Sequence, residues 1–397
     1  MSITLVASPR TSNSMPSPAL AALKPCVENA GYKCYTIDLN IEFYSDLKEH
    51  YSVYGEIDNY FQIDFRYLSK DILDLEPLTE MKKYNLSDDA LKLYKKHLNR
   101  WADYILDQNN EWIGISLLSV NSVLYTIDLA EVLKDKSPDC KIVVGGPGVS
   151  TFGIMGASNL GEFMIVTGLA DRYISGEGEY SLIELLDGEE DIKQHQIDNL
   201  NILPFPDYSD FDFTKYGGSK NKAVAVTGSR GCVRSCTFCD IKSAWKKYRY
   251  RSGTSIANEM INHHQKFGST EFKFTDSLVN GSLKAFEEFL DAIILAKKQG
   301  LITDNIKWSG QFICRPINQF KEEWFEKMSL AGADMLQIGV ESGSEAVMHD
   351  MGKKLSNDDI DFTIRMLSKY NIQCCLLYTS DAADDSLRVD LGGRRII

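Results

Sequence analysis

The sequence has no long hydrophobic run. No stretch of its 397 residues approaches the roughly 18 uninterrupted apolar residues that a membrane-spanning helix needs, although 44% of the chain is hydrophobic. Residues 1–7 lead directly into a strand-like run instead of a charged and then apolar signal peptide. We therefore expect a soluble, cytoplasmic protein that has no membrane partner.

The sequence also has no excess of basic residues. It contains 43 Lys and Arg against 56 Asp and Glu, which gives a formal net charge of −13. Binding of nucleic acid depends on a basic face. The short basic cluster at residues 246–251 is interpreted more simply as a solvated loop, so we expect no nucleic-acid partner.

Cysteine is present, but its pattern is not that of a disulfide framework. The chain has nine cysteines, an odd number, and six of them are scattered, which indicates a reducing compartment. The other three, Cys232, Cys236 and Cys239, lie within eight residues of one another. These three are the most informative feature of the sequence.

The last residues, 375–397, read CLLYTSDAADDSLRVDLGGRRII. This segment resembles the conceptual translation of a sequencing-library adaptor that is joined in frame to a gene, and we therefore exclude it from the fold prediction as non-native. We expect the natural protein to continue past residue 374 with its own sequence. A genuine polar tail is the alternative.

Residues 1–200 alternate strand and helix signals. Short apolar, β-branched runs separated by helical stretches predict a doubly wound parallel α/β sheet. Residues 41–86 are rich in Tyr, Phe, Asp and Glu without a clean period, and we predict that they form an insertion. Strands are expected at residues 3–7, 33–37, 112–116, 141–144 and 163–166, and helices at residues 19–30, 88–105 and 122–133.

Polar or glycine-rich segments lie at strand ends in the later part of this series, at residues 116–119, 145–148 and 175–179. In a parallel sheet, ligands bind beyond the C-terminal ends of the strands. None of the segments is a phosphate loop, because no Gly-Lys-Ser/Thr follows and the spacing is not GxGxxG. Glycine here permits close backbone approach to a flat or bulky ligand, and tight turns after strands are the alternative.

Residues 201–222 break the pattern with two prolines and several Asp residues and are predicted to be a linker. A second strand and helix series then predicts a βα barrel over residues 223–374, truncated at its fifth strand, whose active face is the C-terminal one. Its strands are expected at residues 224–227, 271–275, 306–308 and 335–340, and its helices at residues 256–267, 283–298, 322–330 and 357–370.

The three grouped cysteines follow the first strand of this second series. Thiolates favour zinc or an iron–sulfur cluster. A structural zinc site needs four closed ligands, and only His263 and His264 could fold back to complete one. Three thiolates on a four-iron cluster instead leave one iron without a protein ligand. The cluster is the favoured interpretation, and zinc stays open as the alternative.

This segment resembles the signature of the radical S-adenosylmethionine (SAM) superfamily, CxxxCxxC with an aromatic residue before the last cysteine: Cys232, Cys236, Phe238 and Cys239. The resemblance implies that the thiolates hold a 4Fe-4S cluster, that SAM chelates the open iron, and that the reduced cluster cleaves SAM to methionine and a 5′-deoxyadenosyl radical. It also implies an electron donor, such as flavodoxin or ferredoxin, as a partner.

The same resemblance assigns residues to SAM. Asp276, after the second strand of the barrel, and Glu341 and Ser342, after the fourth, would lie around the amino and ribose groups of SAM. Gln311 and Arg315 would lie on the same face, together with Phe238. Carboxylates can accept hydrogen bonds from an ammonium group or a hydroxyl. Many members of the superfamily have the sequence Gly-Gly-Glu at this position, and Asp276 departs from it.

The first domain resembles the cobalamin-binding module that precedes the barrel in one branch of this superfamily. The resemblance implies that Ser116, Gly145, Gly146, Gly176 and Glu177 contact the corrin. No Asp-x-His-x-x-Gly occurs in the chain, so no histidine of that motif would ligate the cobalt. Shape and backbone contacts would then hold the corrin.

The resemblance implies a cobalamin-dependent methyltransferase that acts on an unknown small-molecule or peptide substrate. Two alternatives stay open. One is a radical SAM enzyme that performs a rearrangement or cyclisation without bound cobalamin. The other is a non-catalytic iron–sulfur protein for electron transfer, which would need a fourth protein ligand to close the cluster.

Overall fold

The computed structural model describes residues 1–9, 12–61, 86–150, 159–217, 222–239 and 241–378. They form two compact units, Met1–Ile197 with Leu203–Ser219, and Asp198–Ile202 with Lys220–Ile397. Leu203–Ser219, which make up most of the predicted linker, belong to the first unit, and the boundaries of the linker stay a prediction. None of the helices in the described residues is long and apolar enough to cross a membrane.

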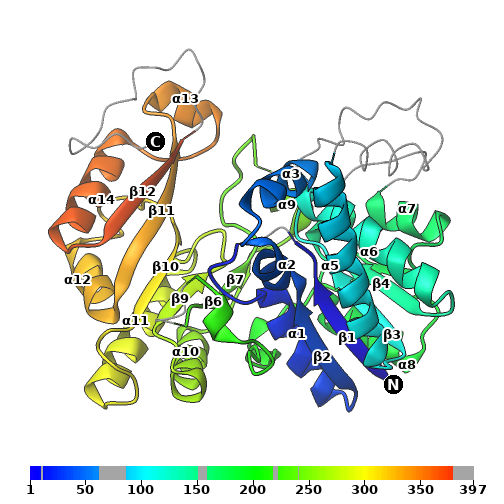
Figure 1. Ribbon diagram of the computed structural model, residues 1–397. Helices are drawn as coiled ribbons and strands as arrows, with labels where there is room; N and C mark the ends of the chain where they lie inside the picture. The colour runs from blue at the N-terminus through cyan, green and yellow to red at the C-terminus, as the bar shows by residue number, and fades with distance from the viewer. Residues whose placement is uncertain (10–11, 62–85, 151–158, 218–221, 240, 379–397) are drawn as a thin grey trace. The chain divides into compact units, whose positions relative to one another are not determined.

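The first unit contains a five-stranded sheet whose strands are all parallel (Figure 1). The strand order is β2-β1-β3-β4-β5, so the order in which successive strands are added to the sheet reverses between β1 and β3. The prediction of a doubly wound parallel sheet is confirmed. The strands are β1 (Ser2–Ala7), β2 (Lys33–Asp38), β3 (Trp112–Ser116), β4 (Lys141–Gly145) and β5 (Arg172–Ile174). The helices are α1 (Pro18–Asn29), α2 (Leu39–Leu47), α3 (Tyr51–Phe61), α5 (Asp88–Asp107), α6 (Val123–Lys136), α7 (Leu160–Val166) and α8 (Gly178–Asp187).

The strand predicted at residues 163–166 is wrong, because these residues form the end of helix α7. The side chain of Asn159 caps this helix by accepting a hydrogen bond from the backbone N–H of Glu162 at 2.9 Å. The buried residues Leu160, Phe163 and Met164 follow helical spacing. A short apolar run does not distinguish a buried strand from a buried helix, and the true fifth strand has only three residues.

Several aromatic residues in the described part of the predicted insertion, Phe43, Tyr60 and Phe61, belong to the core of the first unit. Phe43 of α2 and Phe61 of α3 pack at 5.5 Å between ring centroids, and Phe61 packs against Tyr94 of α5 at 5.7 Å. The buried carboxylate of Asp128 accepts hydrogen bonds from the hydroxyls of Tyr60 and Tyr94. Residues 39–47 and 51–61 are thus helical and partly buried, while residues 62–85 of the insertion lie outside the described residues.

The second unit contains a parallel sheet in the order β12-β11-β10-β9-β6, in which neighbours in the sheet are also successive strands of the series. The four predicted strand and helix pairs are confirmed (Figure 1). The strands are β6 (Val224–Val226), β9 (Glu271–Phe274), β10 (Lys307–Phe312), β11 (Ala333–Glu341) and β12 (Gln373–Tyr378). The helices are α9 (Ile241–Ala244), α10 (Gly253–Phe267), α11 (Leu283–Lys298), α12 (Glu322–Ala331), α13 (Glu345–Asp350) and α14 (Asn357–Lys369).

Strand β12 continues through residues 375–378, which are the first residues of the segment that was excluded from the fold prediction. Its pairing with β11 runs from Gln373 to Tyr378. Residues 379–397 lie outside the described residues, and the adaptor origin of the segment stays a prediction. Within the described residues, β12 and β6 are the outer strands of this sheet.

A small hairpin interrupts the second unit between β6 and α10. Strand β7 (Ser229–Arg230) pairs in an antiparallel manner with β8 (Arg249–Tyr250). We call residues 229–250 the cysteine excursion, because they leave the sheet after β6, carry the three grouped cysteines and return at the same place.

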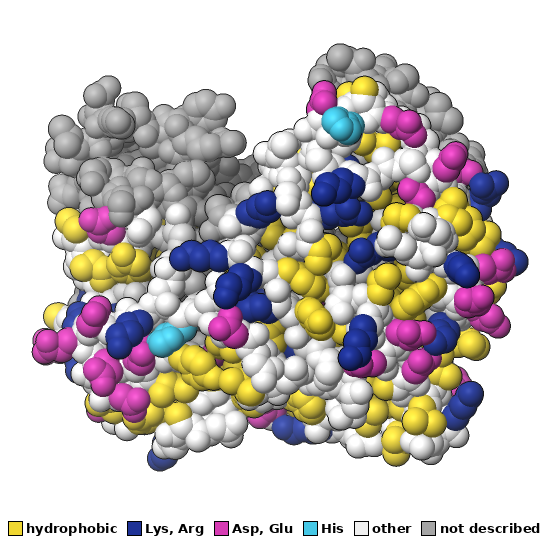
Figure 2. Space-filling model, turned by 180° about the vertical axis from the view of Figure 1, so that it is seen from behind, with side chains coloured by type: hydrophobic (Ala, Val, Ile, Leu, Met, Phe, Trp, Pro, Cys, Tyr) yellow, Lys and Arg dark blue, Asp and Glu magenta, His cyan; other side chains and the backbone are white. Residues whose placement is uncertain are grey.

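On the face that Figure 2 shows, the described surface mixes basic, acidic and apolar side chains.

Candidate functional site

The cysteine excursion begins directly after β6, at the C-terminal end of the strand. Gly231 has a φ of +86°, and a Cβ there would stand 2.8 Å from the carbonyl oxygen of Lys247, so only glycine fits between the two sides of the hairpin. Beyond this turn, Cys232 and Cys236 are half-buried and Cys239 is exposed. All three thiols are free, as an iron–sulfur cluster requires.

The three thiols do not form a site for a single metal ion. Within the described residues, no group of three or more His, Cys, Asp or Glu side chains is arranged to hold one. A four-iron cluster binds each thiolate on a different iron, so it accepts sulfurs that stand farther apart than a single ion would. Burial raises the pKa of the Cys232 thiol, and the backbone N–H of Arg234, 3.4 Å from the sulfur, partly opposes this.

The two histidines considered as zinc ligands have other contacts. His263 is fully buried in α10, where its Nε2 lies 3.8 Å from Oε1 of Glu259. His264 lies within hydrogen-bond distance, 2.9 Å, of the carbonyl oxygen of Ser269. The donor set at the cysteine excursion therefore fits an iron–sulfur cluster better than a closed zinc site.

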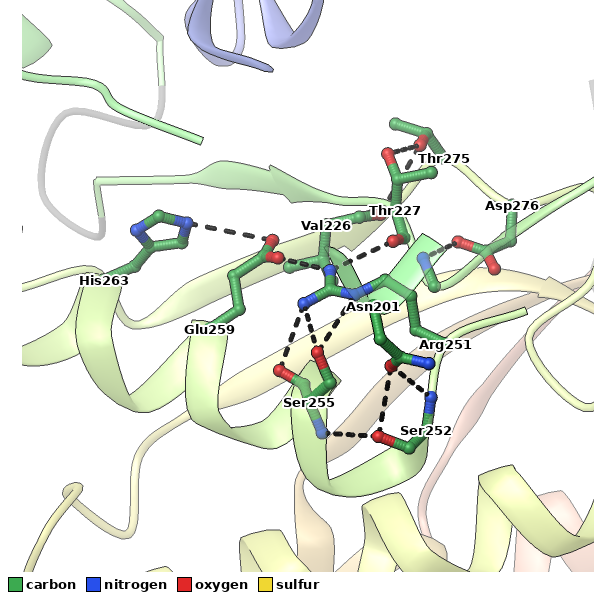
Figure 3. Close-up of polar contacts among 11 residues, drawn as sticks. Asn201, Val226, Thr227, Arg251, Ser252, Ser255, Glu259, His263, Thr275 and Asp276 are labelled. Carbon is green, nitrogen blue, oxygen red and sulfur yellow. Dashed lines mark hydrogen bonds and ion pairs between the residues drawn. The ribbon is translucent and has the colours of Figure 1, made fainter. Parts of the chain in front are cut away.

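Asp276, just after β9, contacts the start of the cysteine excursion and the residue before it. Figure 3 shows its carboxylate beside Thr227 and Arg251. Its carboxylate accepts hydrogen bonds from the backbone N–H of Gly228 at 2.9 Å and from the Ser229 hydroxyl. Burial raises the pKa of Asp276 to about 7, although both hydrogen bonds oppose the rise. A cavity of about 20 Å³ beside the carboxylate, lined in part by Tyr248 and Arg251, has room for about one water molecule.

Arg251 ties the two ends of the cysteine excursion together, and Figure 3 shows its side-chain contacts. Its backbone N–H donates to the carbonyl oxygen of Gly228 at 2.8 Å, and its guanidinium donates to the carbonyl oxygen of Thr227 at 3.2 Å. The guanidinium also bonds Ser255 in the first turn of α10 and pairs with the buried carboxylate of Glu259. Arg251 and Asp276 thus hold the Gly228 peptide from its two sides.

The predicted SAM residues of β10 occupy different environments. Arg315 is half-buried and donates to the carbonyl oxygens of Asn280 and Gly281, each at 2.6 Å, so it joins the segments that follow β9 and β10. Burial lowers the pKa of Arg315, and the nearby positive charge of Arg234 lowers it further. The side chain of Gln311 is exposed, and its backbone carbonyl accepts from the N–H of Val279.

Glu341, at the end of β11, has a φ of +68°, which non-glycine residues rarely adopt. Its carboxylate pairs with the ammonium group of Lys353 at 3.0 Å, and the same ammonium lies 5.5 Å from the ring centroid of Phe238. Ser342 is buried, and its hydroxyl accepts from the N–H of Ser344. Lys353 was not found by the sequence analysis, because nothing local in Gly352-Lys353-Lys354 separates it from a surface lysine.

In the first unit, the predicted corrin residues lie after β3, β4 and β5, at the C-terminal edge of the sheet. Ser116 ends β3, and its carbonyl oxygen accepts from the N–H of Ser8 at the point where the strand order reverses. Gly145 ends β4, and Gly146 follows with a φ of +98°. A Cβ on Gly146 would stand 2.4 Å from the carbonyl oxygen of Leu117, so the two loops approach as closely as backbone allows.

The last two predicted corrin residues have a clear structural use. Gly176 has a φ of +87°, which favours glycine, and it turns the chain from β5 toward α8. Glu177 is buried, and its carboxylate accepts a hydrogen bond from the backbone N–H of Ile197 at 2.7 Å. Leu118, just beyond β3, leaves 57% of its surface exposed at this edge. The edge therefore offers glycine backbone and an apolar side chain, which suit a flat ligand.

Residues 226–380 match the Radical SAM superfamily. The second unit is therefore a radical SAM domain, and the resemblance inferred from its cysteine signature is confirmed.

Among curated proteins, an uncharacterised methyltransferase of Pyrococcus horikoshii is 22% identical over 281 residues, which cover 65% of this chain and 58% of that protein. The anaerobic magnesium-protoporphyrin IX monomethyl ester cyclase of Synechocystis is 23% identical over 274 residues, or 63% of this chain and 51% of the cyclase. The cytidylyl-2-hydroxyethylphosphonate methyltransferase of Streptomyces wedmorensis is 26% identical over 171 residues, or 40% of this chain and 30% of that protein. The chain spans little more than half the length of the first two.

Two of the solved structures that share the fold contain cobalamin. One is the radical SAM methyltransferase TsrM of Kitasatospora setae, with cobalamin and a 4Fe-4S cluster bound. It matches this chain with a TM-score of 0.66 and 15% identity, and the match covers 95% of this chain and 69% of the TsrM chain. The other is the cobalamin-dependent SAM radical enzyme OxsB, with aqua-cobalamin bound. It matches with a TM-score of 0.64 and 17% identity, and the match covers 96% of this chain and 50% of the OxsB chain. The predicted fold class is confirmed by these likenesses.

Proposed function

We propose that this chain is a cobalamin-dependent radical SAM methyltransferase. The observation that carries the proposal is the free thiols of Cys232, Cys236 and Cys239 on one excursion at the C-terminal end of β6, within a radical SAM domain. When bound there, a 4Fe-4S cluster supplies the electron that cleaves SAM to methionine and a 5′-deoxyadenosyl radical. The protein contributes binding, orientation and exclusion of solvent.

The residues at the neighbouring strand ends have matching roles in this proposal. Asp276 and Glu341 accept hydrogen bonds from the amino and ribose groups of SAM. Phe238, Gln311, Arg315 and Ser342 complete the SAM site. In the structure, Glu341 is held by Lys353, and Arg315 is held by two backbone carbonyls, so both side chains are fixed before SAM arrives.

Cobalamin would bind at the C-terminal edge of the first unit. Three observations support this part of the proposal: the strand order reverses beside Ser116, the loops there are built from glycine, and Leu118 is exposed. The names of two relatives describe methyltransferases, and the TsrM and OxsB structures contain cobalamin. Ser116, Gly145, Gly146, Gly176 and Glu177 remain the proposed contacts.

The substrate is proposed to be a small molecule or a peptide that is modified by methyl transfer. The electron would come from a flavodoxin or ferredoxin. All nine cysteines are free, which suits the reducing cytoplasm that we propose as the location.

A second candidate function is radical SAM cyclisation without cobalamin. It is favoured by the match to the Synechocystis protein, whose name describes a cyclase. In that case the first unit would serve as a scaffold with no corrin. Corrin absorbance after reconstitution separates the two candidates, because only the methyltransferase retains it.

The test is anaerobic iron–sulfur reconstitution, followed by electron paramagnetic resonance of the reduced protein with and without SAM. We expect a four-iron signal that shifts when SAM is added and that is lost in Cys236→Ala. The matched control is Cys140→Ala, which removes a half-buried thiol of the first unit and should leave the signal unchanged. A signal that does not change when SAM is added, or that is still present in Cys236→Ala, would contradict the proposal.

A further inference from the structure

The segment between α13 and α14 lies against the cysteine excursion. The backbone N–H of Thr237 donates to the carbonyl oxygen of Met351 at 3.0 Å. Gly352 has a φ of +71°, and a Cβ there would stand 3.4 Å from the carbonyl oxygen of Ser235. The chain that follows β11 therefore contacts the loop that carries the thiols at Ser235 and Thr237, on both sides of Cys236.

Lys353 extends this contact with its side chain, which is buried. Its ammonium donates to the carbonyl oxygen of Gly339 at 2.9 Å and to Oε1 of Glu341 at 3.0 Å. It also lies 5.5 Å from the ring centroid of Phe238, within range of a cation–π attraction. An ammonium has three N–H donors, and these three partners occupy its surroundings. One side chain thus connects the residue beside Cys239 to the end of β11.

The end of β11 is irregular at the place where Lys353 binds. The pairing with β12 shifts register between Gly339 and Glu341, and Glu341 takes the left-handed conformation. A Cβ on Gly339 would stand 3.0 Å from Oε1 of Glu341 and 3.1 Å from Nζ of Lys353, so glycine leaves the space for the ion pair. Backbone strain of this kind persists only when surrounding contacts hold it, and it concentrates at functional sites.

We propose that Lys353 is a positioning residue of the SAM site, which couples the cysteine excursion to the carboxylate of Glu341. The inference rests on the proposed function and adds to it a residue that the family signature does not contain. Lys353 orients Glu341 toward the ligand, and its charge lies beside the loop that holds the cluster. Two effects follow: Lys353 strengthens SAM binding, and its positive charge favours the reduced, more negative form of the cluster.

The experiment compares Lys353→Met and Lys353→Arg with the matched control Lys354→Met, which removes the same charge from an exposed neighbour. Each reconstituted protein is titrated with SAM and followed by electron paramagnetic resonance, and the midpoint potential of its cluster is measured. We expect Lys353→Met to weaken SAM binding about ten- to hundredfold and to make the potential more negative. Lys353→Arg should keep the wild-type potential because it keeps the charge, and Lys354→Met should change neither quantity.

The outcomes are distinguishable. If Lys353→Met matches Lys354→Met in both SAM affinity and potential, the inference is wrong while the proposed function stands. If SAM does not change the electron paramagnetic resonance signal of the wild-type cluster, the proposed function is wrong and the inference is wrong with it. Should Lys353→Met assemble no cluster, Lys353→Arg decides, because a purely structural role predicts wild-type SAM affinity in this charged variant and a positioning role predicts a reduced one.

Discussion

In the first unit the C-terminal ends of the strands are built from glycine and backbone, whereas in the second they carry charged side chains. Gly146 packs on the carbonyl of Leu117, and the carboxylate of Glu177 accepts a hydrogen bond from a backbone N–H. In the second unit, Asp276 and Glu341 stand at the same edge of a similar sheet and bind loop residues. In our proposal the strand ends of the two parallel sheets therefore suit two kinds of ligand: one recognised by shape and one by charge.

Each unit nevertheless has a buried carboxyl with a raised pKa at the end of a strand. Asp38 ends β2 and accepts from the N–H of Ser17 and the hydroxyl of Tyr216, and burial raises its pKa to about 6. Burial raises the pKa of Asp276 to about 7. The two groups differ in their proposed roles, because Asp276 is a residue of the proposed SAM site and Asp38 is not. This difference makes them a matched pair for pH experiments.

The largest expected effect concerns Asp276. An unfolded Asp has a pKa of about 3.9, so between about pH 4 and pH 7 the folded protein keeps a proton that the unfolded chain has lost. Stability is therefore highest below about pH 4 for this group and falls as the pH rises to about 7, by about 4 kcal/mol in total. Asp276→Asn should remove this slope, and urea unfolding of the second unit from pH 4 to pH 8 measures it.

Asp38→Asn is the comparison, and it should remove a shorter slope that ends near pH 6 in the first unit. Adding SAM to the reconstituted protein should flatten only the slope that belongs to Asp276, because an ammonium beside the carboxylate favours its ionised form. If SAM leaves that slope intact, Asp276 does not bind the amino group.

A smaller effect is expected for Gly146→Ala in the first unit. The added Cβ would stand 2.4 Å from the carbonyl oxygen of Leu117, at a φ of +98°. We expect a loss of about 2–4 kcal/mol, from the left-handed conformation and the clash together, and a loss of corrin absorbance. Urea unfolding and absorbance after reconstitution measure these.

The control is Gly168→Ala, where φ is +72° but nothing lies within 4 Å of the new Cβ, so only the conformational cost of about 1 kcal/mol remains. Cluster assembly in the second unit should be unchanged in both variants. Equal effects of the two substitutions would mean that the contact with Leu117 is not tight.

The smallest effects concern helix caps in the two units. The Ser87 hydroxyl accepts from the N–H of Ala90 at the start of α5, and the Ser252 hydroxyl accepts from the N–H of Ser255 at the start of α10. Each Ser→Ala change should cost about 1 kcal/mol of stability. Only Ser252→Ala should also alter the electron paramagnetic resonance signal of the cluster, because Ser252 follows Arg251. Identical signals in both variants would show that this helix end does not reach the site.

The sequence allowed accurate prediction wherever the signal was local. The spacing of Cys232, Cys236 and Cys239 defines a signature without reference to other parts of the chain, and the radical SAM match confirms it. The helix predicted at residues 283–298 has the same bounds as α11, because its apolar residues recur at helical spacing after a capping serine, Ser282. The parallel order of both sheets followed from alternating strand and helix signals.

Prediction failed where tertiary contacts decide between local alternatives. The apolar run at residues 163–166 fits a strand as well as a helix, and the cap from Asn159 and packing within the unit select the helix. The aromatic residues at 43–61 have no clean period along the sequence, because they pack on Tyr94 and Tyr125, which lie far along the chain.

By itself, the sequence determined much of the strand and helix series and the place of the three thiols, because spacing and capping act over a few residues. Only the tertiary structure decided which charges surround that loop. Glu259 reaches Arg251 across a turn of α10, and Lys353 reaches Glu341 and Phe238 from a later segment of the chain. Such pairs depend on how strand ends converge at one edge of the sheet, and convergence is a property of the folded chain.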